Sequence, residues 1–132
     1  MTMQTNPDQL VGILRDTIVT LVRQDGPDLS ARQLGVLLTV YLTPGPHTVR
    51  GLAQELNVSK PAITRALDRL GELDLARRKL DMMDRRSVLV QRTLKGASFL
   101  SALQRTMSES DGTVTPMPPP EMAEAGEYAA VG

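Results

Sequence analysis

Residues 52–96 read LAQELNVSKPAITRALDRLGELDLARRKLDMMDRRSVLVQRTLKG, and this stretch decides the fold. It contains most of one short amphipathic segment, residues 49–56, and all of a second, residues 59–73. A turn of only two residues separates them. Ser59 is a suitable N-cap for the second segment, and Pro61 lies in its first turn, where a missing amide costs little. Two helices joined so closely predict a helix-turn-helix.

The periodicity changes after the second helix. Residues 75–80 and 87–92 read as strands, separated by the polar loop 81–86, and together they predict a hairpin with a charged tip. Thr93 can cap a last helix that starts at Leu94 and ends near Met107. Helix, helix-turn-helix, hairpin and helix in this order predict a winged helix-turn-helix, in which the hairpin is the wing.

Two further helices are predicted before this stretch, over residues 7–24 and 30–42. The second is apolar nearly all round, which is typical of a helix buried on most sides. The first is amphipathic, and it is either a packed surface helix or a helix that belongs to a dimer interface. The predicted fold class is therefore mainly α, a winged helix-turn-helix with a two- to three-stranded β-wing and flanking dimerisation helices.

The charge of the chain is distributed unevenly. The 132 residues hold 15 basic and 15 acidic side chains, and a net charge of zero is not typical of a nucleic-acid-binding protein. However, residues 27–108 hold 13 basic and 7 acidic residues, whereas residues 109–132 hold 5 acidic and no basic ones. A basic body with an acidic tail is compatible with nucleic-acid binding by the basic part of the chain.

The second helix of the motif has a polar face suited to DNA. Hydroxyls can bind phosphates or bases, and an arginine can bind a guanine edge with two hydrogen bonds. Its buried face is predicted to comprise Ala62, Ile63, Ala66, Leu67 and Leu70. The predicted DNA-binding residues of this helix are Ser59, Lys60, Pro61, Thr64, Arg65 and Arg69. For Arg69 we expect a contact to the DNA backbone or a pair with Glu72 or Asp68. A solvated charged face is the alternative.

The predicted wing is also basic. Five basic residues lie within ten positions, namely Arg77, Arg78, Lys79, Arg85 and Arg86. A basic hairpin tip can enter the minor groove, where A·T-rich DNA attracts arginine, and we expect contacts from Arg78, Arg85 and Arg86. Asp84 would meet phosphates on such a loop, so we expect it to orient a nearby arginine through a charge-assisted hydrogen bond. Asp81 is expected to do the same for Arg78.

Residues 52–96 resemble the DNA-binding core of the MarR family of bacterial transcription regulators. The resemblance rests on the LA-x-x-L helix, the V-S-K-P start of the next helix, the L-A-R-R run and the D-x-x-D-R-R wing followed by T-x-K-G. It implies a homodimer that binds pseudo-palindromic double-stranded DNA. It also implies a wing-tip arginine contact, at Arg85 or Arg86, with Asp84 as the orienting carboxylate. A small-molecule effector is left open and unassigned.

Several residues depart from the pattern of that family. Asp74 stands where glycine is usual, and Asp tolerates the left-handed conformation better than most residues. Gly71 lies inside a helix, Arg92 replaces an apolar residue, and Met82 and Met83 occupy the wing tip. The last helix is also short for a family whose dimer interface includes a long C-terminal helix.

The predicted organisation has four parts: an N-terminal dimerisation helix (1–28), a DNA-binding winged helix (29–93), a C-terminal dimerisation helix (94–108) and an acidic, Pro-rich disordered tail (109–132). The tail either solubilises the protein or competes with DNA for the basic face. No apolar run approaches the ~20 residues that span a membrane, and the N-terminus lacks the features of a signal peptide. We therefore expect a soluble cytoplasmic protein, associated with the nucleoid.

Other classes of function fit the sequence less well. With no Cys, one His (His47, in a Pro-Gly loop) and no phosphate loop or metal-ligand spacing, we expect no enzyme, cofactor or metal site. A winged-helix protein–protein adaptor would expose aromatic or aliphatic residues on its docking face. A non-specific architectural DNA-binding protein would show salt-dependent binding without a preferred site.

Overall fold

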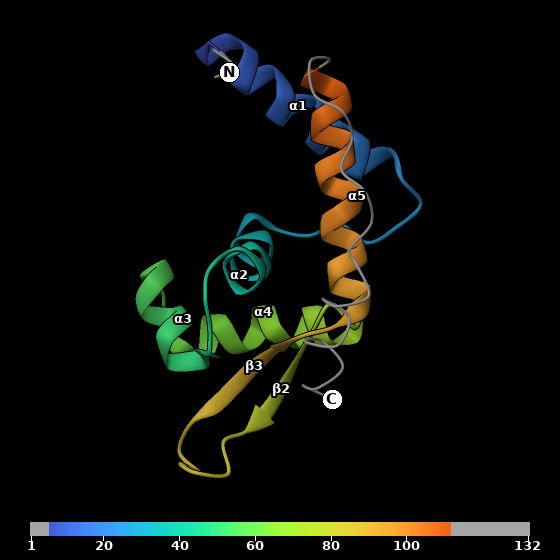
Figure 1. Cartoon of the computed structure of the whole chain (residues 1–132). Helices are drawn as coiled ribbons and strands as arrows, with labels where there is room; N and C mark the ends of the chain where they lie inside the picture. The colour runs from blue at the N-terminus through green and yellow to red at the C-terminus, as the bar shows by residue number, and fades with distance from the viewer. Residues whose placement is uncertain (1–5, 112–132) are drawn as a thin grey trace. The chain divides into compact units, whose positions relative to one another are not determined.

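The computed structural model describes residues 6–111, and it confirms the mainly α winged-helix class (Figure 1). The elements in chain order are α1 (Pro7–Arg23), α2 (Ala31–Leu42), β1 (His47–Thr48), α3 (Val49–Leu56), α4 (Lys60–Glu72), β2 (Ala76–Leu80), β3 (Val88–Arg92) and α5 (Leu94–Asp111). The described residues form two compact units, one of residues 29–98 and one of residues 6–28 with 99–111.

The helices of the 29–98 unit begin where the sequence places suitable caps. The Ser30 hydroxyl accepts from the Gln33 amide, and the Gln33 side chain accepts from the Ser30 amide, which forms a capping box. The Thr48 hydroxyl caps α3. Asn57 ends α3 in the left-handed conformation, with φ of 55°, and this conformation permits the short turn into α4.

A small antiparallel sheet completes this unit. Its strand order is β1-β3-β2, and Arg78 of β2 faces Val90 of β3 in the register. Helix α4 packs against α2, α3 and β2. The largest side chains of the core come from these helices: Val36, Leu37, Val40, Leu52, Ile63, Leu67 and Leu70. The hairpin of β2 and β3 extends from this core to the wing loop (Figure 1).

A buried polar network joins α2 to the base of the hairpin, where the chain enters β2 and leaves β3. The Tyr41 hydroxyl donates to the Leu75 carbonyl at 2.7 Å and accepts from the Thr93 amide at 2.8 Å. The Thr93 hydroxyl donates to the Asp74 carbonyl at 2.7 Å and accepts from the Gly96 amide at 2.9 Å. Asp74 has φ of 57°, as predicted for the turn after α4. The network therefore fixes the hairpin against the helix-turn-helix.

The second unit pairs α1 with the later part of α5. The Ser110 hydroxyl donates to the Asp16 carboxylate at 2.7 Å, and this bond, followed by one from Arg15, lowers the pKa of Asp16. Gln9 bonds to Asp111 at 3.4 Å. These contacts hold the end of α5, so residues 109–111 are helical, and their prediction as tail was wrong. Residues 112–132, the rest of the predicted tail, lie outside the described residues.

Helix α1 exposes an apolar surface. Its exposed large side chains are Leu10, Val11, Leu14, Ile18 and Val22. Leu10, Leu14 and Ile18 follow one another at four-residue spacing, which places them on the same side of the helix. By contrast, Thr17 is buried, with its hydroxyl bonded to the Ile13 carbonyl at 2.6 Å.

Candidate functional site

The polar face of α4 begins at its N-terminus. Lys60, Pro61 and Arg65 are exposed and Thr64 is half-buried. All five residues predicted for the opposite face are buried, as helical periodicity indicated: Ala62, Ile63, Ala66, Leu67 and Leu70. Because packing against α2 and α3 buries that face, the polar face is turned towards solvent. Exposed Ser59 caps the helix, since its hydroxyl oxygen accepts from the Ala62 amide at 3.2 Å.

The basic side chains in the two halves of α4 differ in their ion pairing. In the second half, Arg69 pairs with Glu72 at 3.1 Å, one of the partners expected for it. In the first half, Lys60 and Arg65 form no ion pair with any residue in the range 6–111. The first half of α4 therefore presents uncompensated positive charge beside the Ser59 and Thr64 hydroxyls.

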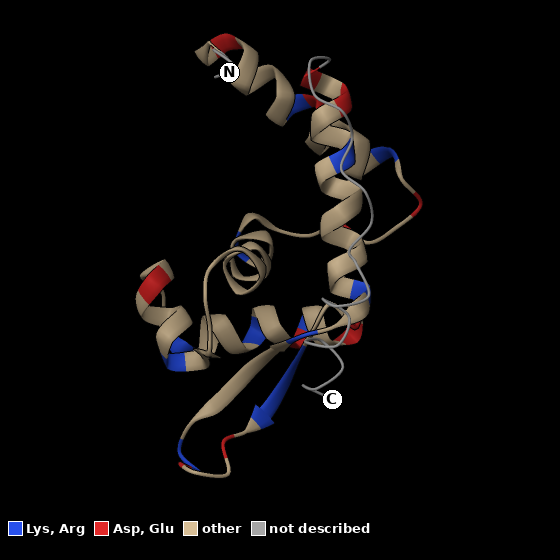
Figure 2. Ribbon diagram, in the orientation of Figure 1, with Lys and Arg blue, Asp and Glu red and all other residues tan. Residues whose placement is uncertain are grey.

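Strand β2 carries the basic run of the wing (Figure 2). Arg77 pairs with Asp74 at 3.1 Å, and Arg78 pairs with Asp68 at 2.5 Å. The expected pair of Arg78 with Asp81 was therefore wrong, because the packing of β2 on α4 brings Arg78 to Asp68. The exposed side chain of Lys79 has no ion pair within the part of the chain that the structure describes.

The wing loop is braced by its two aspartates. Asp84 Oδ1 accepts from the Arg86 amide at 3.1 Å and lies 3.5 Å from Arg86 Nε. Asp81 Oδ1 accepts instead from the Met83 amide at 2.9 Å. The Arg86 side chain is nonetheless 90% exposed, and Arg85 is exposed as well. Asp84 thus contacts the Arg86 guanidinium at Nε and leaves its two outer nitrogens accessible.

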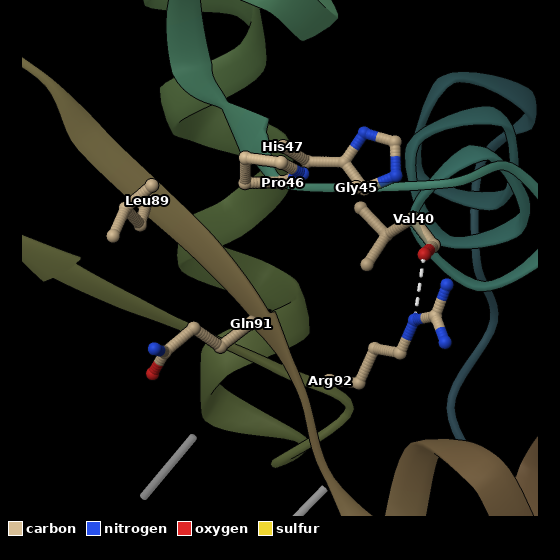
Figure 3. Close-up of a pocket in the computed structure, with 7 residues that line it drawn as sticks. All are labelled: Val40, Gly45, Pro46, His47, Leu89, Gln91 and Arg92. Carbon is tan, nitrogen blue, oxygen red and sulfur yellow. Dashed lines mark hydrogen bonds between the residues drawn. The ribbon is translucent and has the colours of Figure 1, made fainter. Parts of the chain in front are cut away.

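A shallow hollow of about 210 Å³ lies beside the sheet (Figure 3). Its lining residues are Val40, Gly45, Pro46, His47, Leu89, Gln91 and Arg92. Arg92 Nε donates to the Val40 carbonyl at 2.9 Å, and Nη2 donates to the Thr43 carbonyl at 3.3 Å. Arg92 therefore caps the C-terminal end of α2, which explains a charged residue at this strand end. The hollow is smaller than the ~300 Å³ of small ligand pockets, and we assign no effector to it.

Three other features of the described residues bear on function: possible metal ligands, possible membrane-spanning helices and the histidine. Across residues 6–111, no group of three or more His, Asp or Glu side chains is arranged to hold a metal ion. In the same range, no helix combines the length and the apolar character needed to cross a bilayer. The ring nitrogen Nε2 of His47, the one histidine of the chain and the first residue of β1, lies 3.1 Å from the carbonyl oxygen of Thr43 at the end of α2.

The α4 face and the wing belong to the same unit, so the fold brings the predicted site residues onto one body. The Arg78–Asp68 pair links the two directly. Lys79 was named among the basic residues of the wing but not among the predicted DNA contacts, although its place in the run Arg77-Arg78-Lys79 was a usable signal. Strand alternation puts Lys79 and Arg78 on opposite sides of β2, and only Arg78 meets α4.

Comparison with known proteins agrees with this geometry. Residues 28–87 match the model of the MarR family. The solved structure of MarR is 27% identical, covers 79% of this chain and 76% of its own, and has a TM-score of 0.60. A complex of S. aureus MepR with DNA is 18% identical, covers 94% of this chain and 90% of its own, and has a TM-score of 0.64. Reduced AbfR bound to DNA is 20% identical, covers 77% of this chain and 70% of its own, and has a TM-score of 0.59. The chain matches no curated protein sequence.

Proposed function

We propose that the chain is a transcription regulator of the MarR family that binds specific sites in double-stranded DNA, a proposal supported by the match of residues 28–87 to the model of that family. One observation carries the proposal: the first half of α4 exposes Lys60 and Arg65 without ion-pair partners in the described residues. Ser59 and Thr64 provide hydroxyls beside them. Such a face suits base edges and phosphates in a major groove.

The wing supports a second contact. Arg85 and Arg86 are exposed at the end of the hairpin, and Asp84 contacts Nε of Arg86. We propose that the wing enters the minor groove beside the site read by α4, where narrow A·T-rich DNA attracts arginine. Arg69 and Arg78 are already paired with carboxylates on the protein, so we assign them secondary contacts to the DNA backbone.

The exposed apolar face of α1 supports self-association. Leu10, Leu14 and Ile18 form an exposed stripe on a helix of the second unit. We propose that this stripe contributes to a homodimer, since burying apolar surface against a second copy is favourable. A dimer would bind two half-sites about one helical turn apart, ~10 base pairs centre to centre.

Two of the neighbouring structures, MepR and AbfR, are of proteins bound to DNA. A protein–protein adaptor is a weaker candidate, because the face of α4 exposes charged and hydroxyl side chains rather than aromatic or aliphatic ones. A purely architectural DNA-binding protein would use the same cations without reading bases.

A competition experiment separates these functions. We expect the protein to bind labelled genomic fragments that carry its site and to keep them in an excess of random duplex. Displacement by random duplex in proportion to its concentration would indicate an architectural protein, since phosphate contacts alone do not distinguish sequences. Failure to bind any duplex at low salt would contradict the proposal.

Asp84→Ala is expected to weaken DNA binding about fivefold, although it removes a negative charge from the wing. The reason is that Asp84 holds both the amide and the guanidinium of Arg86, so its loss lets the arginine move. Binding is measured by fluorescence anisotropy at fixed salt. The control is Glu55→Ala, an exposed acid of α3, which should leave affinity unchanged or slightly higher. Tighter DNA binding by Asp84→Ala, as for the control, would show that Asp84 only repels phosphate.

A further inference from the structure

The wing loop ends in an apolar tip. Met83 is 95% exposed and Met82 is 69% exposed, and Leu80 before them is exposed as well. Single exposed apolar side chains are ordinary on protein surfaces. Here, however, three lie within four positions, from the last residue of the basic strand β2 into the wing loop that carries the exposed pair Arg85 and Arg86. Apolar side chains gathered at a cationic tip have nothing to bury against within the 29–98 unit.

Hydrogen bonds within the loop hold the backbone that carries this tip. The Asp81 amide donates to the Ser87 carbonyl at 3.0 Å, and the Ser87 amide donates to the Asp84 carbonyl at 2.9 Å. The Met83 amide donates to Asp81 Oδ1 at 2.9 Å. Because these bonds brace the loop backbone from within, the loop already has the shape that presents the tip, and binding has mainly the exposed side chains left to order.

We propose that Met83 is an apolar wedge that enters the minor groove beside Arg86 and contacts a base step there, an inference that rests on the proposed DNA-binding function. The exposed cations Arg85, Arg86 and Lys79 match the negative potential of the groove and bring the tip to it. Methionine is among the side chains that partially unstack base steps from the minor-groove side, most easily at flexible pyrimidine–purine steps. Met83 then adds affinity and a preference for a deformable step in the flank of the site.

The wedge predicts a loss of affinity that salt does not change. Met83→Ala should weaken binding about tenfold, which is what burying most of a methionine side chain contributes. The slope of log K against log salt should stay the same, because no phosphate contact is lost. In contrast, Arg86→Ala should reduce that slope by about one if it meets a phosphate. Met83→Leu should restore most of the affinity, and the control Leu42→Ala, an exposed apolar residue at the end of α2, should have no effect.

A fluorescent base tests the contact itself. With 2-aminopurine placed in the flank of the selected site, wild-type protein and Met83→Leu should raise its fluorescence by unstacking it, and Met83→Ala should not. Equal affinity and equal fluorescence for Met83→Ala and wild type would overturn the wedge, while binding that still depends on Arg65 would leave the DNA-binding function standing. Loss of binding by the wild type itself would contradict both.

Discussion

Gly96→Ala is expected to unfold the winged helix or to lower its free energy of unfolding by about 3 kcal/mol or more. A Cβ at this position would clash with the Tyr41 hydroxyl and with the Leu75 carbonyl. Neither group can move freely, because the hydroxyl bonds both to that carbonyl and to the Thr93 amide. Shifting Tyr41 would leave buried polar groups unpaired, at roughly 1–3 kcal/mol each.

Urea denaturation followed by circular dichroism measures this loss. The matched control is Gly71→Ala, because a Cβ at Gly71 meets only the Ala76 carbonyl, at an ordinary 3.9 Å. Replacing a glycine within a helix should there raise the free energy of unfolding by roughly 0.5–1 kcal/mol. Equal stability of the two variants would show that the Tyr41 network does not hold the hairpin.

Arg65→Ala is expected to weaken binding to the cognate site by about 1–3 kcal/mol and to relax the preference at one base pair. Arg65 is exposed on the first half of α4 and has no ion pair in the described residues, so its guanidinium is free to bind two acceptors of a guanine edge. Affinity is measured by anisotropy on the cognate site and on a set of single-base variants. The control is Arg32→Ala, an exposed arginine at the start of α2, which should bind as the wild type does.

The pattern of loss across the variant sites identifies the contact. Discrimination lost at one position indicates a base contact, whereas equal weakening on every sequence would mean that Arg65 binds only phosphate. Unchanged affinity everywhere would remove the first half of α4 from the interface.

The helix-turn-helix could be predicted because its signals are local. The cap at Ser59 and the apolar periodicity of the helices lie within a few residues of what they determine. The left-handed turn at Asp74 was expected from the resemblance to a family that usually has glycine at this position, and Asp is among the residues that tolerate this conformation. The α4 face followed from the same periodicity, because its five buried residues determine which side chains remain outside.

Long-range contacts could not be predicted in this way. Arg78 has Asp81 nearby in sequence, yet the packing of β2 against α4 pairs it with Asp68. Strand β1 has only two residues and forms by pairing with β3, more than forty positions away. The end of α5 was misplaced because composition alone marked residue 109 as tail, whereas Asp16 of α1 meets Ser110. Each outcome depends on a partner that the local pattern does not contain.

Selection of bound fragments from the genome most directly tests whether this winged helix reads sequence. The protein is incubated with sheared duplex at physiological salt, and the retained fragments are sequenced. We predict enrichment of an inverted repeat with half-sites ~10 base pairs apart, which reports both sequence reading and a symmetric dimer. Retained fragments without any shared sequence would contradict specific recognition by α4 and the wing.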